Sequence, residues 1–224
     1  MVCTYSIKFV EQIQKSAIEV LHTSQVGTTS RQCTCNEMTN CYDSARNEAY
    51  DCFTPCWHEV QKITSDPKTL KTCFDARKGF LEELVNCFKD KLRACAQDVS
   101  KAEQIQVHNY DYVAMINRAE LVIQNQMAKF LQSVTSPSVK QVIDAATNLG
   151  RCVKECFIEK NKNGFCFDKI PCQPNISDRN AKQAVRQCAR QISWKTEIGE
   201  LCKCSSAAGV SGISDYCGML RVMG

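Results

Sequence analysis

The chain has 224 residues, of which 44% are hydrophobic and 23% are charged, so it has the composition of a globular protein and not of a disordered one. Its net charge of +4 is too small to indicate a nucleic-acid-binding protein, and no apolar run approaches the 18 residues that suggest a transmembrane helix. With only nine glycines and five prolines, the sequence favours helices over a β-sandwich.

Five long segments have apolar residues that recur every three to four positions, which is typical of amphipathic helices. They cover 5–22, 37–63, 67–96, 112–134 and 137–160. Pro55 lies inside the second segment, and a kink or break is expected near Phe53 because proline removes a backbone donor and clashes with the preceding turn. Segment 23–31 is interpreted as a polar loop, and segment 97–108 as either a helix start or a linker.

Local capping chemistry sets the expected helix starts. Two starts combine a capping side chain with a proline in the first turn, Asp66-Pro67 and Ser136-Pro137. Segment 166–174 is too rich in proline for a helix. Three shorter helices follow, over 179–192 with Asp178 as its cap, over 196–202 and over 213–220. No segment predicts a β-strand, so the expected fold is all-α.

Seventeen cysteines indicate the compartment in which this protein works. In an oxidising environment so many cysteines form disulfides, whereas in the cytosol they would need a metal. The sequence contains neither Cys-x2-Cys pairs nor clustered histidines, which are the usual signs of a metal site. A secreted, extracellular protein without a metal is therefore expected. Sixteen cysteines are predicted to form its disulfides: Cys33, Cys35, Cys41, Cys52, Cys56, Cys73, Cys87, Cys95, Cys152, Cys156, Cys166, Cys172, Cys188, Cys202, Cys204 and Cys217.

Because the number of cysteines is odd, at least one thiol is free or pairs with another chain. Cys3 is the candidate because it lies 30 residues before the next cysteine, and it would permit a disulfide-linked homodimer. The cysteines form two groups, which suggests stapled helical units over 1–98 and 150–224 joined by a cysteine-free helical connector over 99–149. One continuous bundle is the alternative. The motifs Cys52-x3-Cys56 and Cys152-x3-Cys156 form a weak internal repeat.

Motifs of common enzyme classes are absent from the sequence. It has no Gly-x-Ser-x-Gly elbow, no phosphate-binding loop, no His-Glu-x-x-His and no Gly-x-Gly-x-x-Gly. The chain is therefore expected to be non-enzymatic and to need no cofactor.

The predicted helix after Asp178 carries a row of basic residues on one face. At 100° per residue, this row falls within about 80° of arc, and it consists of Arg179, Lys182, Arg186 and Arg190. The opposite face is apolar, with Ala181, Val185, Cys188 and Ile192. Guanidinium and ammonium groups in such a row can bind sulfated glycans, anionic head groups or an acidic protein partner. The alternative is a solvated helix face with no ligand.

Two further features have a structural and a functional interpretation. Asn175-Ile176-Ser177 is an N-glycosylation sequon just before this helix, so the protein is expected to be a glycoprotein. Aromatic and methionine side chains could line a cavity for a lipid or another small apolar ligand, or could simply fill the core. These residues are Trp57, Phe80, Phe88, Met127 and Phe130.

The C-terminal third resembles a known group of secreted proteins. Its pattern is Cys152-x3-Cys156, Cys166, Cys172 with Pro174, Cys188, Leu201-Cys202-x-Cys204, Ala208-Gly209-Val210 and Tyr216-Cys217. This pattern resembles the cysteine-rich helical proteins that nematodes secrete, and it is similar to the chondroitin-proteoglycan type of domain. The resemblance implies an extracellular, non-enzymatic role, although clustered Ser-Gly sites for glycosaminoglycan attachment are missing from this sequence.

The sequence as a whole predicts an all-α, disulfide-rich bundle of about seven to eight helices. The expected function is secreted, non-enzymatic binding of an anionic glycan or a protein partner, and the alternative is a carrier of an apolar ligand.

Overall fold

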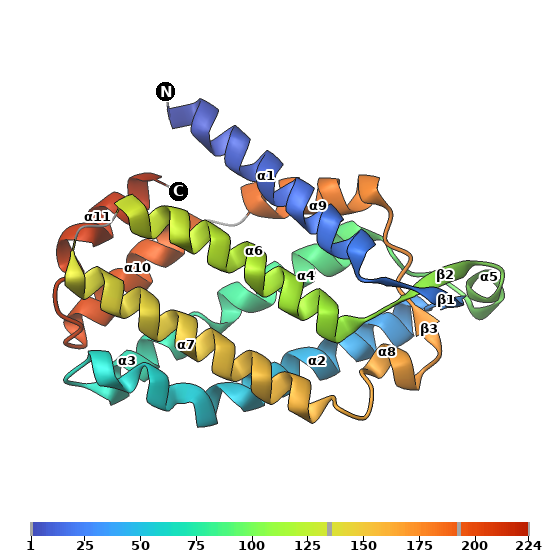
Figure 1. The fold of residues 1–224 in the computed structure, drawn as a ribbon, viewed down its shortest axis with the longest axis horizontal. Coiled ribbons are helices and arrows are strands. Elements are labelled where there is room, and N and C mark those ends of the chain that lie inside the picture. The colour runs from blue at the N-terminus through green and yellow to red at the C-terminus, as the bar shows by residue number, and fades with distance from the viewer. Residues whose placement is uncertain (1, 134–135, 192–193, 224) are drawn as a thin grey trace.

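The computed structural model describes residues 2–133, 136–191 and 194–223, with residues 2–10 described as backbone only, and it shows a disulfide-rich helical fold with one small sheet (Figure 1). The longer helices are α1 (Val2–Thr23), α2 (Cys35–Cys56), α3 (Pro67–Asp75), α4 (Lys78–Leu92), α6 (Tyr112–Ser133), α7 (Pro137–Lys160), α9 (Asp178–Gln191), α10 (Trp194–Ala207) and α11 (Ser214–Met223). Two short helices, α5 (Val99–Glu103) and α8 (Cys166–Lys169), accompany the strands β1 (Gln25–Gln32), β2 (Gln106–Tyr110) and β3 (Cys172–Gln173). The predicted fold class is confirmed.

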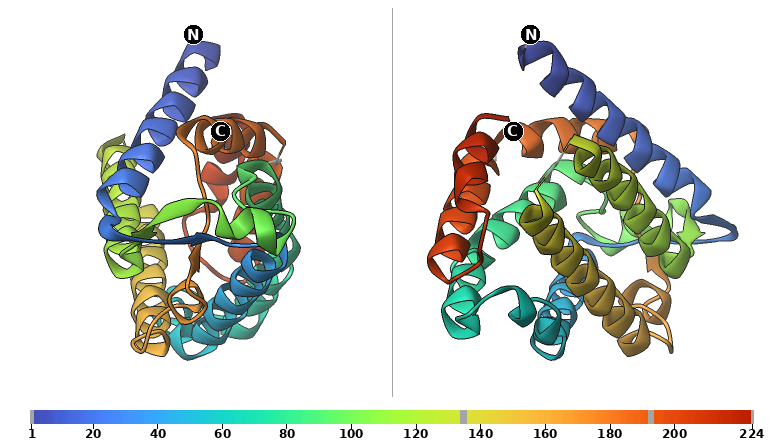
Figure 2. Two further views of the ribbon diagram at one scale, coloured as in Figure 1. Left: turned by 90° about the vertical axis from the view of Figure 1, so that its right-hand side faces the viewer. Right: turned by 60° about the vertical axis from the view of Figure 1, so that its left-hand side comes forward.

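The sheet lies at one end of the molecule and the α10–α11 pair at the other, with the long helices between them (Figures 1 and 2). Helix α2 packs against α7, and α9 packs against both α4 and α1. The buried core is divided in the same way. One cluster joins α3, α7, α10 and α11, a second joins α2 and α7, and a third joins α2, α8 and the strand end near Cys33.

Eight disulfides use all sixteen predicted cysteines. The pairs are Cys33–Cys172, Cys35–Cys95, Cys41–Cys166, Cys52–Cys156, Cys56–Cys152, Cys73–Cys204, Cys87–Cys188 and Cys202–Cys217. Six of them join segment 1–98 to segment 150–224, and each of these two segments holds only one disulfide within itself. The two segments are therefore stapled mainly to each other, an arrangement that fits the alternative of one continuous bundle.

The two Cys-x3-Cys motifs pair with each other. Cys52 bonds to Cys156 and Cys56 bonds to Cys152, with Cα–Cα distances of 5.7 Å in both disulfides. Cysteines four apart lie on the same face of a helix, so the crossed order of the pairs fixes α2 and α7 as antiparallel neighbours. Each thiol bonds to the neighbouring helix, as the spacing predicts.

The expectation that the chain has no β-strand is wrong. β1 lies in the segment interpreted as a loop, and it pairs antiparallel with β2 and parallel with β3. Its residues are mostly exposed and polar, so it lacks the alternating burial from which a strand is recognised. The pairing partners and the Cys33–Cys172 disulfide, which joins the end of β1 to β3, hold the strand in place.

Some helix boundaries differ from the predicted ones for local reasons. Helix α2 runs through Phe53 and Pro55 to Cys56 and then changes to 3-10 turns, so the expected break near Phe53 is absent from the assigned helix. The predicted helix 67–96 is divided into α3 and α4 at Ala76 and Arg77. Segment 166–174, predicted to be non-helical, contains the single turn α8. None of the described helices is long and apolar enough to cross a membrane.

Candidate anion-binding face

Helix α9 buries one side and exposes the other. Ala181, Ala184, Val185 and Cys188 are buried against α4 and α1, with at most 9% of their surface exposed. The predicted apolar stripe is confirmed for its first three members, and Ile192 lies outside the described residues. The burial of this side orients the opposite side of α9 toward solvent.

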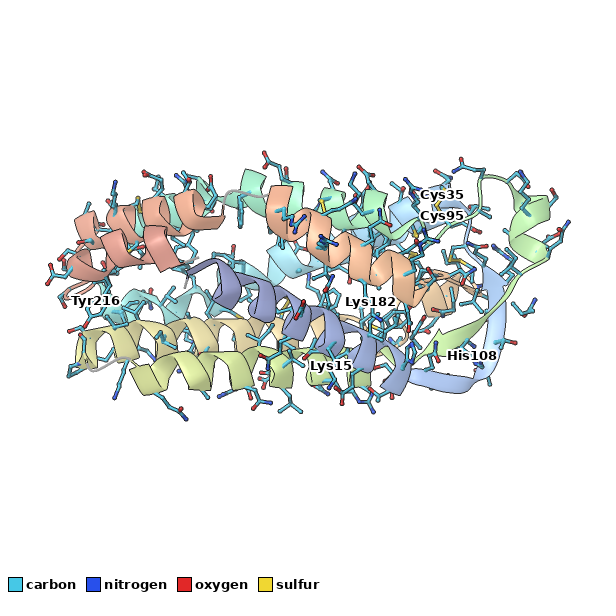
Figure 3. The ribbon with its side chains drawn as sticks, turned by 90° about the horizontal axis from the view of Figure 1, so that it is seen from above. Lys15, Cys35, Cys95, His108, Lys182 and Tyr216 are labelled. Atoms are coloured by element: carbon cyan, nitrogen blue, oxygen red, sulfur yellow. A yellow bond between two sulfur atoms is a disulfide. The ribbon has the colours of Figure 1, made fainter. Side chains whose placement is uncertain are left out.

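Three kinds of contact hold α9 in place. The Cys87–Cys188 disulfide ties it to α4, and the Gln14 side chain on α1 donates a hydrogen bond to the Lys182 carbonyl at 2.7 Å. His22 Nε2 on α1 lies 2.6 Å from Asp178 Oδ1. Figure 3 looks onto α9 and α1 and shows Lys182 and Lys15 on these two neighbouring helices. The helix is therefore a rigid platform for its outward side chains.

The cap of α9 differs from the predicted one. The helix begins at Asp178, and the Ser177 hydroxyl accepts a hydrogen bond from the Asn180 backbone N–H at 3.3 Å. Ser177 is therefore the N-cap, and Asp178 lies in the first turn with its carboxylate turned to His22. The predicted cap, Asp178, is therefore wrong by one residue, and its carboxylate contacts His22 on α1 instead.

All four basic residues of the predicted row are exposed, and we call them the α9 basic face: Arg179, Lys182, Arg186 and Arg190. The last lies eleven positions after the first, which corresponds to about 16 Å along a helix. Among the residues that the structure describes, none of the four takes part in an ion pair, whereas other cations such as Lys154 and Arg77 are paired with glutamates. These four charges therefore need not break an existing contact to bind a ligand.

The helices beside α9 carry exposed charges of both signs. On α1, the exposed residues alternate in sign, with Lys15 between Glu11 and Glu19. On α4, the exposed charged residues are Lys78, Glu82, Glu83 and Asp90. A ligand that follows the α9 axis would meet four cations, whereas one that crosses onto either neighbour would meet charges of both signs. The geometry thus favours a narrow, linear anion over a flat anionic surface.

Asn175 occupies an exposed position in the loop between β3 and α9. Its backbone N–H donates to the Ala94 carbonyl at 2.8 Å, and the next residue, Ile176, packs against the core. The loop is anchored while the Asn175 side chain remains accessible, which is what an attached glycan requires.

Of the residues predicted to line an apolar cavity, the three whose side chains the structure describes line neither of the described hollows. Trp57 packs against Phe53 in a tilted arrangement and against Phe74 edge-to-face, at ring-centroid distances of 5.6 Å and 5.4 Å, as part of an ordinary aromatic core. Phe80 and Phe88 are half-buried on α4, and the side chains of Met127 and Phe130 lie outside the described residues. The described hollows are open grooves lined mainly by polar and charged residues on α1 and between α6 and α7. The carrier function stays a prediction.

Two other predicted features concern cysteine and metal. The side chain of Cys3, the candidate for a free or intermolecular thiol, lies outside the described residues. Within the described part of the chain, no three His, Cys, Asp or Glu side chains are grouped so as to hold a metal ion.

Comparison with protein-family models, with curated proteins and with solved structures gives no match for this chain.

Proposed function

We propose that this chain is a secreted, non-enzymatic protein that binds sulfated glycans through the α9 basic face. The observation that carries the proposal is the exposure of four cations, free of ion pairs among the described residues, along one side of a helix whose other side is buried. Eight disulfides support the extracellular part, because such bonds persist in oxidising compartments.

Arginine is suited to this task. Its planar guanidinium donates two parallel hydrogen bonds to an oxyanion, and it holds its charge at every physiological pH. Three of the four residues in the face are arginines, namely Arg179, Arg186 and Arg190. Their spacing along the helix axis matches a linear polyanion with repeated sulfates better than a single small anion.

The test is retention on a heparin column, measured as the salt concentration at elution. Arg186→Glu with Arg190→Glu should elute at clearly lower salt than the unmodified protein, with an affinity at least about ten-fold weaker, because two charge-assisted contacts become repulsive. Lys62→Glu with Lys68→Glu is the matched control, since both lysines are exposed and lie away from α9. Both double variants bring the net charge from +4 to 0.

Equal elution of the two double variants would show that retention follows net charge alone, and it would overturn the α9 basic face as the site. Retention that survives only in the control variant would support it. Far-ultraviolet circular dichroism of both variants shows whether either has lost the helical fold.

A further inference from the structure

The eight disulfides differ in how far solvent can reach them. In seven of them at least one cysteine is buried, with 7% or less of its surface exposed. In the eighth, Cys35–Cys95, both cysteines are only partly buried. Figure 3 shows this pair near the end of the molecule that carries the strands. Because thiol–disulfide exchange needs access of a thiolate to sulfur, this difference singles out one bond.

The surroundings of Cys35 stabilise a negative charge on its sulfur. Cys35 is the first residue of the 22-residue helix α2, and the dipole of a helix favours negative charge at its N-terminus. The side-chain amide of Gln97 also donates to Cys35 Sγ at 3.6 Å. The nearby Glu37 carboxylate would oppose this effect, but Arg31 neutralises it through two hydrogen bonds of 2.9 Å and 2.6 Å.

We infer that Cys35–Cys95 is the site at which this protein exchanges disulfides with an external low-molecular-weight thiol. The external thiolate attacks Cys95 Sγ, the bond between the two cysteines breaks, and Cys35 leaves as the thiolate that the helix end and Gln97 stabilise. A second external thiolate then attacks the mixed disulfide and releases Cys95. In total, the protein disulfide gains two electrons and two protons, and two external thiols become one disulfide.

The fold around the bond is held by other contacts, so exchange can occur without unfolding. The Cys35 backbone N–H donates to the Ala96 carbonyl, and the Ala96 N–H donates to the Cys33 carbonyl, both at 2.9 Å. Cys33 itself is fixed to β3 by its buried disulfide with Cys172. The inference does not depend on the α9 basic face, which lies on another helix.

Limited reduction with glutathione under native conditions tests the inference. Thiols that appear are blocked with light N-ethylmaleimide, the protein is then denatured and fully reduced, and the remaining thiols are labelled with a heavy form before peptide mapping. A sample without glutathione gives the baseline. Light label should appear at Cys35 and Cys95 together, at least about ten-fold faster than at any other pair. Earlier labelling of a different pair, or simultaneous labelling of all pairs, would overturn the inference.

The position of the glutathione adduct shows which of the two cysteines the external thiolate attacks. The trapped glutathione adduct should lie on Cys95, and an adduct mainly on Cys35 would overturn the assigned leaving group.

Gln97→Glu should slow the labelling of Cys35 and Cys95 several-fold, because a carboxylate repels the developing thiolate. Gln61→Glu, at an exposed position in the 3-10 turn Gln61–Ile63, makes the same charge change elsewhere and should leave the rate unchanged. Equal rates in the two variants would contradict the role of Gln97.

Discussion

Cys56 on α2 is bonded to Cys152 on α7 one helical turn away from the Cys52–Cys156 disulfide, so the two helices are joined by a pair of adjacent covalent rungs. Taken alone, each rung closes a loop of about a hundred residues, for which chain entropy gives a stabilisation near 4.7 kcal/mol. When one rung is present, however, the other closes a ring of only about ten residues. The two contributions therefore overlap.

Replacement of both Cys56 and Cys152 by alanine should lower the free energy of unfolding by about 2–3 kcal/mol, as expected for a short loop. Removal of both rungs should cost slightly more than twice the loss from one, because the second rung then closes a longer ring, of about 23 residues, with the neighbouring Cys41–Cys166 disulfide. Urea titration of the three proteins measures both quantities. A loss near 4.7 kcal/mol from one rung alone would show instead that the rungs act independently.

Gly209→Ala should destabilise the fold by about 2 kcal/mol or more. Gly209 has φ +85°, a conformation that costs a residue with a side chain about 1–2 kcal/mol, and an added Cβ would lie 2.1 Å from Ser65 Oγ and 3.3 Å from the Ser65 backbone nitrogen. Gly150→Ala is the matched control, because Gly150 lies within α7 with no atom near an added Cβ. That control should gain about 0.5–1 kcal/mol, and thermal melts in which Gly209→Ala is the more stable variant would contradict this assignment.

The ion pair between Glu37 and Arg31 should make stability depend on pH in acid. Hydrogen bonds from the Arg31 guanidinium, and from Thr34, lower the pKa of Glu37 from 4.5 to about 2. A carboxylate with a lowered pKa in the folded state contributes stability that is present above its unfolded pKa and is lost as the pH falls toward 2.

Glu37→Gln removes the charge but keeps a side chain that can complete the capping box with Thr34. The variant should be about 1.5 kcal/mol less stable than the unmodified protein at pH 7, and the difference should shrink below pH 4.5 and vanish near pH 2. Asp43→Asn, which removes the exposed pair with Arg46 at 3.4 Å, should change stability by less than about 0.5 kcal/mol. A difference for Glu37→Gln that stays constant from pH 7 to pH 2 would exclude the charge as its cause.

Asn175 should carry an N-linked glycan when the chain is produced in a eukaryotic secretory pathway. Treatment with a peptide-N-glycosidase should then remove the glycan mass and convert Asn175 to aspartate, a change that peptide mass spectrometry locates. Asn175→Gln should abolish the modification, whereas Ser177→Thr, which keeps both the sequon and an N-cap hydroxyl, should retain it. An unmodified Asn175 peptide from secreted protein would refute the prediction.

Local chemistry was sufficient to predict most helices of this fold. Asp66 caps α3 through the Thr69 N–H at 3.1 Å, and Ser136 caps α7 through the Val139 N–H at 3.5 Å, as the Asp-Pro and Ser-Pro signals indicate. The exposed α9 basic face follows from the same helical periodicity. These features depend on residues a few positions apart, which the sequence shows directly.

The features that were missed depend on distant residues. β1 is a strand because β2 and β3 lie beside it, and its own residues show only a weak signal in Val26, Thr28 and Thr29, which are β-branched. The disulfide partners could not be deduced either, since residues up to 139 positions apart are joined. The partial exposure of Cys35–Cys95 is a property of the packed fold, and no spacing of cysteines reveals it.

The cross-linking of the first segment to the last affects how this protein is made. A chain emerging from the ribosome presents Cys33, Cys41, Cys52, Cys56, Cys73 and Cys87 long before their partners, which all lie beyond residue 150. Of the eight disulfides, only Cys35–Cys95 has both cysteines in the part that is synthesised first. During synthesis, these six thiols can therefore form incorrect disulfides before their partners exist. Most native disulfides must form after the chain is complete, and their formation should require a disulfide isomerase.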